Sequence, residues 1–167
     1  MKKNILILIL TSFLCTQSNH IYLELLGPGL VGSVNYEKSI NDKLFVRGGI
    51  GIPLKVSESS FSGTSEIKVT PIIFGFNYLR GNNFKFDASA GVSLWMIDFK
   101  GSTPQDIGGL EFDSEGSYPL LYTSFGFRYQ KPTGGITLKA GLSATNIVVE
   151  ETSGMIPAIY FGGGYSF

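Results

Sequence analysis

The sequence predicts an all-β chain that closes into a single antiparallel up-and-down barrel of eight strands. Apolar residues alternate with small or polar ones over most of the chain, which is the period of a β-strand. The connections between these stretches are alternately short and long, and the chain ends on an aromatic residue that belongs to the alternation. Each strand then has one apolar and one polar face, so we expect a transmembrane barrel with an apolar outside and a polar inside.

Length and composition limit the fold and its partners. The 167 residues suffice for one ordinary domain. Lys and Arg balance Asp and Glu at 13 each, so we predict no nucleic-acid partner. Charged residues make up 16% of a chain rich in glycine and aromatic residues, against roughly 25% in soluble proteins. This composition favours β-structure at an interface.

The first 18 residues are a predicted signal peptide, which leaves 19–167 as the barrel domain. Two lysines precede a short apolar stretch, and small residues at 16–18 suit cleavage. The stretch is much shorter than the ~20 residues of a membrane-spanning helix. Cys15 is the only cysteine, and bulky residues before it disfavour the alternative of a lipid anchor.

The alternation is clearest at the C-terminus, where one face is apolar and the other small or polar. Phe167, Tyr165 and Phe161 share the apolar face, and Ser166 and Gly164 share the other. The same split recurs in five earlier segments. Residues expected to face outward there include Val46, Ile50, Phe74, Phe76, Phe86, Val92, Phe125, Phe127, Leu138 and Leu142.

The second face separates this chain from a soluble sandwich, whose exposed face carries many Lys and Glu residues. Here that face is mostly Gly, Ser, Thr and Asn. Small residues suit the crowded interior of a narrow barrel, and the charge-free apolar face is long enough for the ~9–11 residues of a membrane-crossing strand. An open sheet would leave backbone groups unpaired in lipid, so the sheet must close.

Connection lengths set the strand count. The short turns at 41–42, 81–83 and 131–134 alternate with longer polar segments at 57–66, 103–116 and 150–154. Outer-membrane barrels place short turns on the periplasmic side and long loops outside. A strand at 21–26 with Gly27-Pro28-Gly29 as its outer turn completes eight, whereas the alternative makes residues 21–37 one long bulged strand.

The segment Tyr160-Phe161-Gly162-Gly163-Gly164-Tyr165-Ser166-Phe167 resembles the closing strand of Gram-negative outer-membrane barrels. The whole of residues 19–167 is similar in architecture to the small OmpX and OmpA-type class. This resemblance implies that Phe161, Tyr165 and Phe167 form the signal that the barrel assembly machinery reads. It also implies location in the outer membrane, in contact with lipid that includes lipopolysaccharide.

Six charged residues are expected inside the barrel. They are Glu24, Arg47, Lys85, Asp87, Arg128 and Lys139. A lone charge in a narrow, low-dielectric interior is costly, so we predict a salt-bridge network that plugs the barrel, with Asp87 paired to Arg128 or Lys85. The alternative is a narrow ion path lined by these charges.

No catalytic group emerges from the sequence. Enzymes on such barrels resemble one another in needing a histidine beside a serine or a carboxylate. His20 is the only histidine, and we interpret it as a solvated residue at the end of the first strand. The acidic residues of 103–116 lack the spacing of a calcium loop, so we predict no metal and no cofactor.

These observations favour a non-enzymatic outer-membrane barrel with a structural or adhesive role, whose surface recognition is carried by residues 57–66 and 101–116. The extracellular partner is not predicted. Two alternatives stay open: a narrow pore for ions or small solutes, and a soluble secreted β-barrel that binds a hydrophobic ligand.

Overall fold

The computed structural model describes residues 19–60, 63–102, 111–149 and 152–167. The predicted signal peptide and Cys15 lie outside these ranges. Among the described residues, no helix is long and apolar enough to cross a membrane. The elements are β1 (Asn19–Leu25), the 3-10 turn η1 (Gly27–Gly29), β2 (Gly32–Ser39), β3 (Leu44–Gly51), β4 (Leu54–Ser60), β5 (Gly63–Gly81), β6 (Phe84–Ser102), β7 (Glu111–Gln130), β8 (Gly135–Val149) and β9 (Thr152–Ser166).

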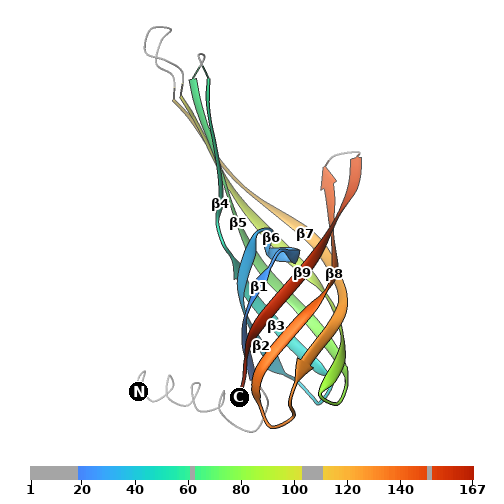
Figure 1. Cartoon of the computed structure of the whole chain (residues 1–167). Coiled ribbons are helices and arrows are strands. Elements are labelled where there is room, and N and C mark those ends of the chain that lie inside the picture. The colour runs from blue at the N-terminus through green and yellow to red at the C-terminus, as the bar shows by residue number, and fades with distance from the viewer. Residues whose placement is uncertain (1–18, 61–62, 103–110, 150–151) are drawn as a thin grey trace, which may run out of the picture.

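The strands form a closed antiparallel barrel (Figure 1). They are hydrogen-bonded in the order β3-β2-β1-β9-β8-β7-β6-β5-β4, and an additional pairing of β3 with β5 closes the ring. β3 and β4 are successive parts of one wall strand, because both pair with β5. The nine segments therefore make eight wall strands, and the predicted fold is confirmed. Residues 21–37 belong to two strands joined by η1, so the single bulged strand is wrong.

The two ends of the described chain meet at the lower end of the barrel. Asn19 N donates to Phe167 O at 2.7 Å, and Phe167 N donates to Asn19 O at 2.9 Å. The three predicted short turns lie at this same end (Figure 1). In the first of them the Asn41 side-chain oxygen accepts hydrogen bonds from the backbone of Lys43 and Leu44, which is how asparagine stabilises a tight turn.

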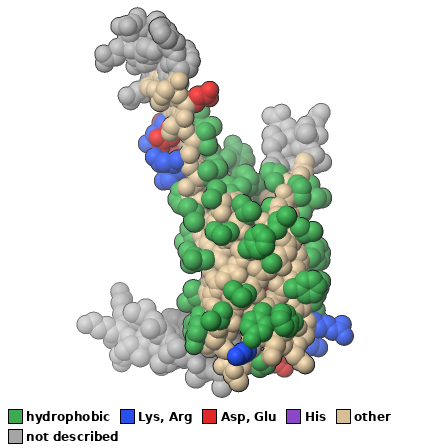
Figure 2. All heavy atoms as spheres, in the orientation of Figure 1, with side chains coloured by type: hydrophobic (Ala, Val, Ile, Leu, Met, Phe, Trp, Pro, Cys, Tyr) green, Lys and Arg blue, Asp and Glu red, His purple; other side chains and the backbone are tan. Residues whose placement is uncertain are grey.

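Side chains alternate as predicted. Phe125, Phe161 and Leu138 are 58%, 54% and 54% exposed, whereas Arg128 and Lys139 are 0% and 4% exposed. Hydrophobic side chains cover much of the visible outside of the barrel (Figure 2). This arrangement is the reverse of a soluble protein and is the one expected of a membrane-spanning barrel.

Inward glycines make room for inward tyrosines. Gly75 pairs with Gly91 across β5 and β6, and a Cβ on either would collide with the Tyr122 side chain. Gly126 and Gly141 form the same kind of pair beneath the Tyr160 hydroxyl. The glycines that composition alone associated with β-structure are thus needed because large rings cross a narrow interior.

Four prolines mark the upper end of the closed barrel. Pro53 separates β3 from β4, and Pro71 lies opposite that break on β5. Pro119 just precedes the β7–β8 pairing, which starts at Leu121, and Pro157 lies on β9 above its last pairing with β1. Proline cannot donate to a ladder, so it fits where a strand loses a neighbour.

Above this level four strands continue as an upper sheet. It consists of β4 with residues 63–70 of β5, 95–102 of β6 and 111–120 of β7, and it rises far beyond the barrel (Figure 1). The predicted loops at 57–66 and 103–116 are therefore largely paired strands, since Ser57 pairs with Glu66 and Lys100 with Asp113. Only 61–62 and 103–110 of those segments lie outside the described residues.

Candidate functional site

Arg128 is the centre of an ion-pair network in the barrel lumen. It projects inward from β7, and its Nη1 and Nη2 donate to the two carboxylate oxygens of Glu37 on β2 at 2.5 and 3.0 Å. Its Nε donates to Asp87 Oδ2 on β6 at 2.9 Å. A guanidinium has a fixed fork of donors, and here two carboxylates from opposite sides of the lumen occupy it.

Arg47 and Lys139 extend the network from the other walls. Arg47 Nη2 on β3 donates to Glu24 Oε1 at 2.6 Å, and its Nε donates to Asn35 Oδ1 at 3.0 Å. Lys139 Nζ on β8 lies 3.0 Å from Glu24 Oε2 and 3.8 Å from Asp87 Oδ2. Three cations thus meet three carboxylates, which leaves the network without net charge.

Tyr22 stands among these charges. Its hydroxyl donates to Glu37 Oε1 at 2.6 Å. Arg47, Arg128 and Lys139 approach its ring, with distances to the centroid of 5.6, 5.8 and 4.6 Å. Cations over an aromatic face are attracted to it, most strongly when water is excluded. The lumen is therefore filled by mutually bonded side chains.

The structure brings together five of the six charged residues expected inside the barrel, and it adds one that the sequence analysis did not name. Ion pairs link five of them in one chain, in the order Arg47, Glu24, Lys139, Asp87, Arg128. Asp87 pairs with Arg128, one of its two expected partners. Within the described residues Lys85 joins no ion pair, and it lies half-buried near the lower end.

The missed member is Glu37, which is fully buried. Its signal was available, because Ser33, Asn35 and Glu37 alternate with Val34 and Tyr36 along β2. The orientation of residues after Gly27-Pro28-Gly29 depends on whether 21–37 form one strand or two, so Glu37 was not assigned to the lumen. His20 was also misinterpreted: it is 0% exposed, and its ring packs edge-on against Phe45 at 5.1 Å, since it faces the lumen rather than solvent.

The turn η1 closes the upper mouth of the lumen. Gly27, Pro28 and Gly29 are buried, and the Pro28 carbonyl accepts a hydrogen bond of 2.9 Å from Ser93 Oγ on β6. A Cβ on Gly27 would meet Tyr160 of β9, and one on Gly29 would approach Ile73 of β5. The turn was predicted at the outer end, and it lies there, but it folds inward between opposite walls.

The backbone on either side of η1 has unusual dihedral angles. Leu26 and Leu30, which flank η1, have φ angles of 63° and 62°. Residues with side chains rarely adopt a positive φ angle, and such sparsely populated backbone conformations cost on the order of 1–3 kcal/mol per residue. The surrounding contacts must hold the turn in place.

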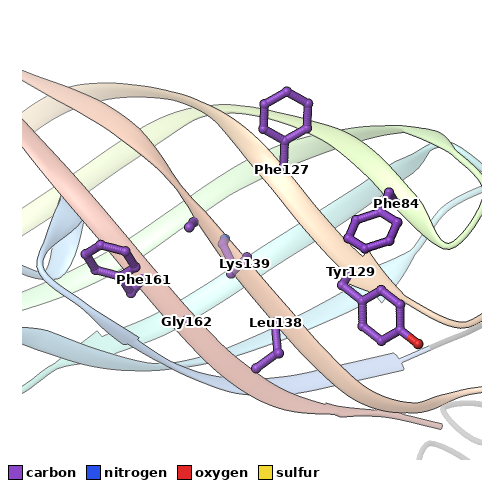
Figure 3. Close-up of a pocket in the computed structure, with 8 residues that line it drawn as sticks. Phe84, Phe127, Tyr129, Leu138, Lys139, Phe161 and Gly162 are labelled. Atoms are coloured by element: carbon purple, nitrogen blue, oxygen red, sulfur yellow. The ribbon is translucent and has the colours of Figure 1, made fainter.

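The outer face near the lower end is a continuous apolar surface. Figure 3 shows a shallow depression of it, lined by Phe84, Phe127, Tyr129, Leu138 and Phe161. The rings of Phe84 and Tyr129 lie 5.1 Å apart. Tyr165 and Phe167 are exposed on this same outward side.

The upper sheet reverses the polarity of the barrel on both of its faces. Its outward face, which continues the apolar face of the barrel, carries Lys55, Glu66, Lys68, Asp98, Lys100, Asp113 and Glu115. Its inner face, which continues the polar lumen, is mostly apolar and carries Val56, Ile67 and Phe99, with Glu58 as a charged exception on β4. The Lys55 side chain donates to Glu66 at 2.8 Å, and this hydrogen bond and its charge lower the pKa of Glu66.

Comparison with known proteins identifies the fold of the chain. The sequence matches no protein-family model and no curated protein. The structure is similar to Ail, the attachment invasion locus protein of Yersinia pestis, in complex with the heparin analogue sucrose octasulfate, with a TM-score of 0.57, 13% identity, and coverage of 90% of this chain and 99% of Ail. The fold is that of a small eight-stranded outer-membrane β-barrel.

A second structure of Ail has a TM-score of 0.51 and 14% identity, covering 90% of this chain and 97% of that one. The N-terminal β-barrel domain of Pseudomonas aeruginosa OprF has a TM-score of 0.49 and 13% identity, covering 90% of this chain and 96% of that domain. At this identity, the likeness to Ail concerns the fold alone.

Proposed function

We propose that this protein is a non-enzymatic outer-membrane barrel with a closed lumen, which acts at the cell surface through its upper sheet. The observation that carries the proposal is the reversal of polarity between barrel and upper sheet. On β5 the outward side chains are apolar from Phe76 to Ile72, and from Lys68 onward they are charged. A chain with that boundary fits a bilayer around the barrel and water around the sheet.

Membrane placement is tested by carbonate washing and by heat-modifiable migration on gels. The expected protein stays in washed membranes and runs faster unboiled than boiled. A protein released into the supernatant would support the alternative of a soluble barrel for a hydrophobic ligand. The described interior argues against that alternative, because ion pairs and tyrosines fill it.

The closed lumen favours a plug over a pore. Arg128, Glu37 and Asp87 bridge opposite walls, and η1 covers the upper mouth. Planar-bilayer recordings should therefore show no steady openings. Steady openings whose conductance changes when Arg47 or Lys139 is replaced would favour the narrow ion path.

The upper sheet is the proposed recognition surface. Ail, which shares the fold, is described as an attachment protein and binds a polysulfated heparin analogue. On the outward face of this chain, Lys55, Lys68 and Lys100 are interspersed with four carboxylates. A mixed-charge face is better suited to a protein surface than to a polysulfated glycan.

Adhesion is tested with a variant in which a two-residue turn replaces residues 56–67, which shortens the upper sheet and keeps the barrel. Bacteria that display it should adhere to host cells or to one another less than bacteria with the full chain, at equal heat-modifiable surface protein. Equal adhesion by both would contradict the proposal.

Two further parts of the proposal concern assembly and chemistry. Phe161, Tyr165 and Phe167 would direct assembly, so removal of Phe167 should lower insertion into membranes.

The only histidine, His20, is buried beside Phe45 and away from solvent. Overexpression should leave lipid A mass spectra unchanged, and a modified lipid A would overturn the non-enzymatic role.

A further inference from the structure

The upper sheet ends in two strands that lack a neighbour on one side within the described residues. β4 pairs with β5 alone. β7 pairs with β8 only over residues 121–130, so residues 111–120 pair with β6 alone. Such edges present unpaired backbone donors and acceptors, to which another strand can be added.

The two edges carry opposite charges on their outward face. On β4 the outward residues are Lys55, Ser57 and Ser59, a face with one cation and no carboxylate. On β7 they include Asp113 and Glu115 and no cation.

Like charges also lie opposite each other on neighbouring strands of the upper sheet, once between β4 and β5 and once between β6 and β7. Lys55 lies directly opposite Lys68, and Asp98 lies directly opposite Glu115. Like charges in directly opposed positions destabilise a sheet, and opposite charges stabilise it. These pairs are partly compensated, because Lys68 lies 4.0 Å from Asp98 and Lys55 contacts Glu66 on the neighbouring strand at 2.8 Å. An opposite charge supplied from beyond each edge would add to this compensation.

A second copy in the same membrane supplies those charges. All copies share one orientation, so β4 runs upward and β7 downward in each (Figure 1). The β4 edge of one copy and the β7 edge of the next are therefore antiparallel, and their outward faces carry opposite charges. Two-fold contacts would instead set β4 beside β4 or β7 beside β7, with lysine next to lysine or carboxylate next to carboxylate.

We propose that copies of this protein associate laterally, with the β4 edge of one upper sheet against the β7 edge of its neighbour. The contact is heterologous, so it forms a ring or an open row rather than a closed dimer. Val56 on β4 and Tyr118 on β7 are 55% and 54% exposed near these edges, and the contact would cover part of both. The inference rests on the proposed placement in a membrane, which gives all copies one orientation.

The test uses the full chain, reconstituted at low density in liposomes and labelled for single-molecule counting. The wild type should form assemblies of two or more copies. Lys55→Glu alone, or Asp113→Lys with Glu115→Lys, should weaken assembly several-fold, and all three changes together should restore it. Lys131→Glu, an exposed charge change at the lower end, is the matched control and should leave assembly unchanged.

Cysteine cross-linking fixes the geometry. In a Cys15→Ser background, Lys55→Cys and Glu115→Cys chains should cross-link when mixed, and neither should cross-link to itself. Self-linking of either single variant would indicate a two-fold contact and overturn the proposal. Monomers throughout, or reversals without effect, would also overturn it. Heat-modifiable migration of the same samples shows whether the barrel has inserted, so a failed membrane placement is distinguished from a failed association.

Discussion

The barrel and the upper sheet are made of the same strands but have opposite faces. On β5, Phe76, Phe74 and Ile72 point outward in the barrel, and Lys68 and Glu66 point outward above it. The inward side changes the other way. Asn77 and Gly75 face the lumen, and above Pro71 the same side carries Val69 and Ile67.

This contrast separates what the backbone determines from what the solvent determines. The period of two runs unbroken along β5 and sets only which residues share a face. Which face is apolar depends on whether lipid or water surrounds that level of the strand.

The largest effect is expected in the lumen. Arg128→Ala leaves Glu37 and Asp87 buried without their shared cation, which typically costs about 3–5 kcal/mol of unfolding free energy. Lys68→Ala, which removes an exposed pair of the upper sheet, should cost at most about 0.5 kcal/mol. Urea unfolding in liposomes, followed by gel migration, measures both, and similar losses would remove the distinction between the regions.

A charge on the outward face should be costly only in the barrel. Phe74→Arg should lower the free energy of unfolding by about 2–4 kcal/mol, because the exposed Phe74 would face the bilayer interior in the proposed membrane placement. Thr70→Arg, four residues along the same face, should lower it by about 0–1 kcal/mol. The same unfolding assay decides this, and an equal cost at both positions would put the boundary elsewhere.

The η1 turn connects β1 to β2 at the upper end of the barrel, and its attachment should contribute less. Ser93→Ala removes the hydrogen bond to the Pro28 carbonyl and should cost about 1 kcal/mol. Ser117→Ala, on the outward face of the upper sheet, should cost nothing measurable. Unfolding midpoints test the difference, and bilayer recordings of Ser93→Ala would reveal whether η1 also seals the lumen.

The smallest effect concerns Glu66, whose pKa is lowered by the hydrogen bond and charge of Lys55. The ion pair is complete above the folded-state pKa and is lost as pH falls through it. Lys55→Ala should raise the pKa of Glu66 toward its ordinary value without changing barrel stability. An NMR titration of the Glu66 carboxylate measures this, and an unchanged titration would show that Lys55 does not hold it.

Sequence reasoning succeeded where alternation and burial act together. The faces of Phe125, Leu138, Arg128 and Lys139 follow from counting by two, because lipid and a narrow lumen impose opposite chemistry on neighbouring residues. It failed where one of these constraints ends. Residues 57–66 were predicted as a loop because they lack the alternating apolar residues of the barrel strands. A strand with water on both faces does not need an apolar face.

The lumen contacts were harder to predict for a geometric reason. Alternation places Glu37 and His20 on the inward face, but which side chains meet across the barrel depends on the stagger of all strands. The inward fold of η1 depends on contacts with distant strands, through Ser93 and Tyr160. A local pattern such as Gly27-Pro28-Gly29 predicts a turn, and its direction is a property of the closed barrel.

Spin labels along β5 would test the central claim most directly. Single cysteines introduced from residue 66 to residue 78 in a Cys15→Ser background would be labelled in liposomes, and collisions with oxygen and with a water-soluble nickel complex would be compared. We expect labels at Phe76, Phe74 and Ile72 to collide preferentially with oxygen, and labels at Lys68 and Glu66 with nickel. Outward positions below Pro71 that favour nickel would contradict a barrel whose outer face is solvated by lipid.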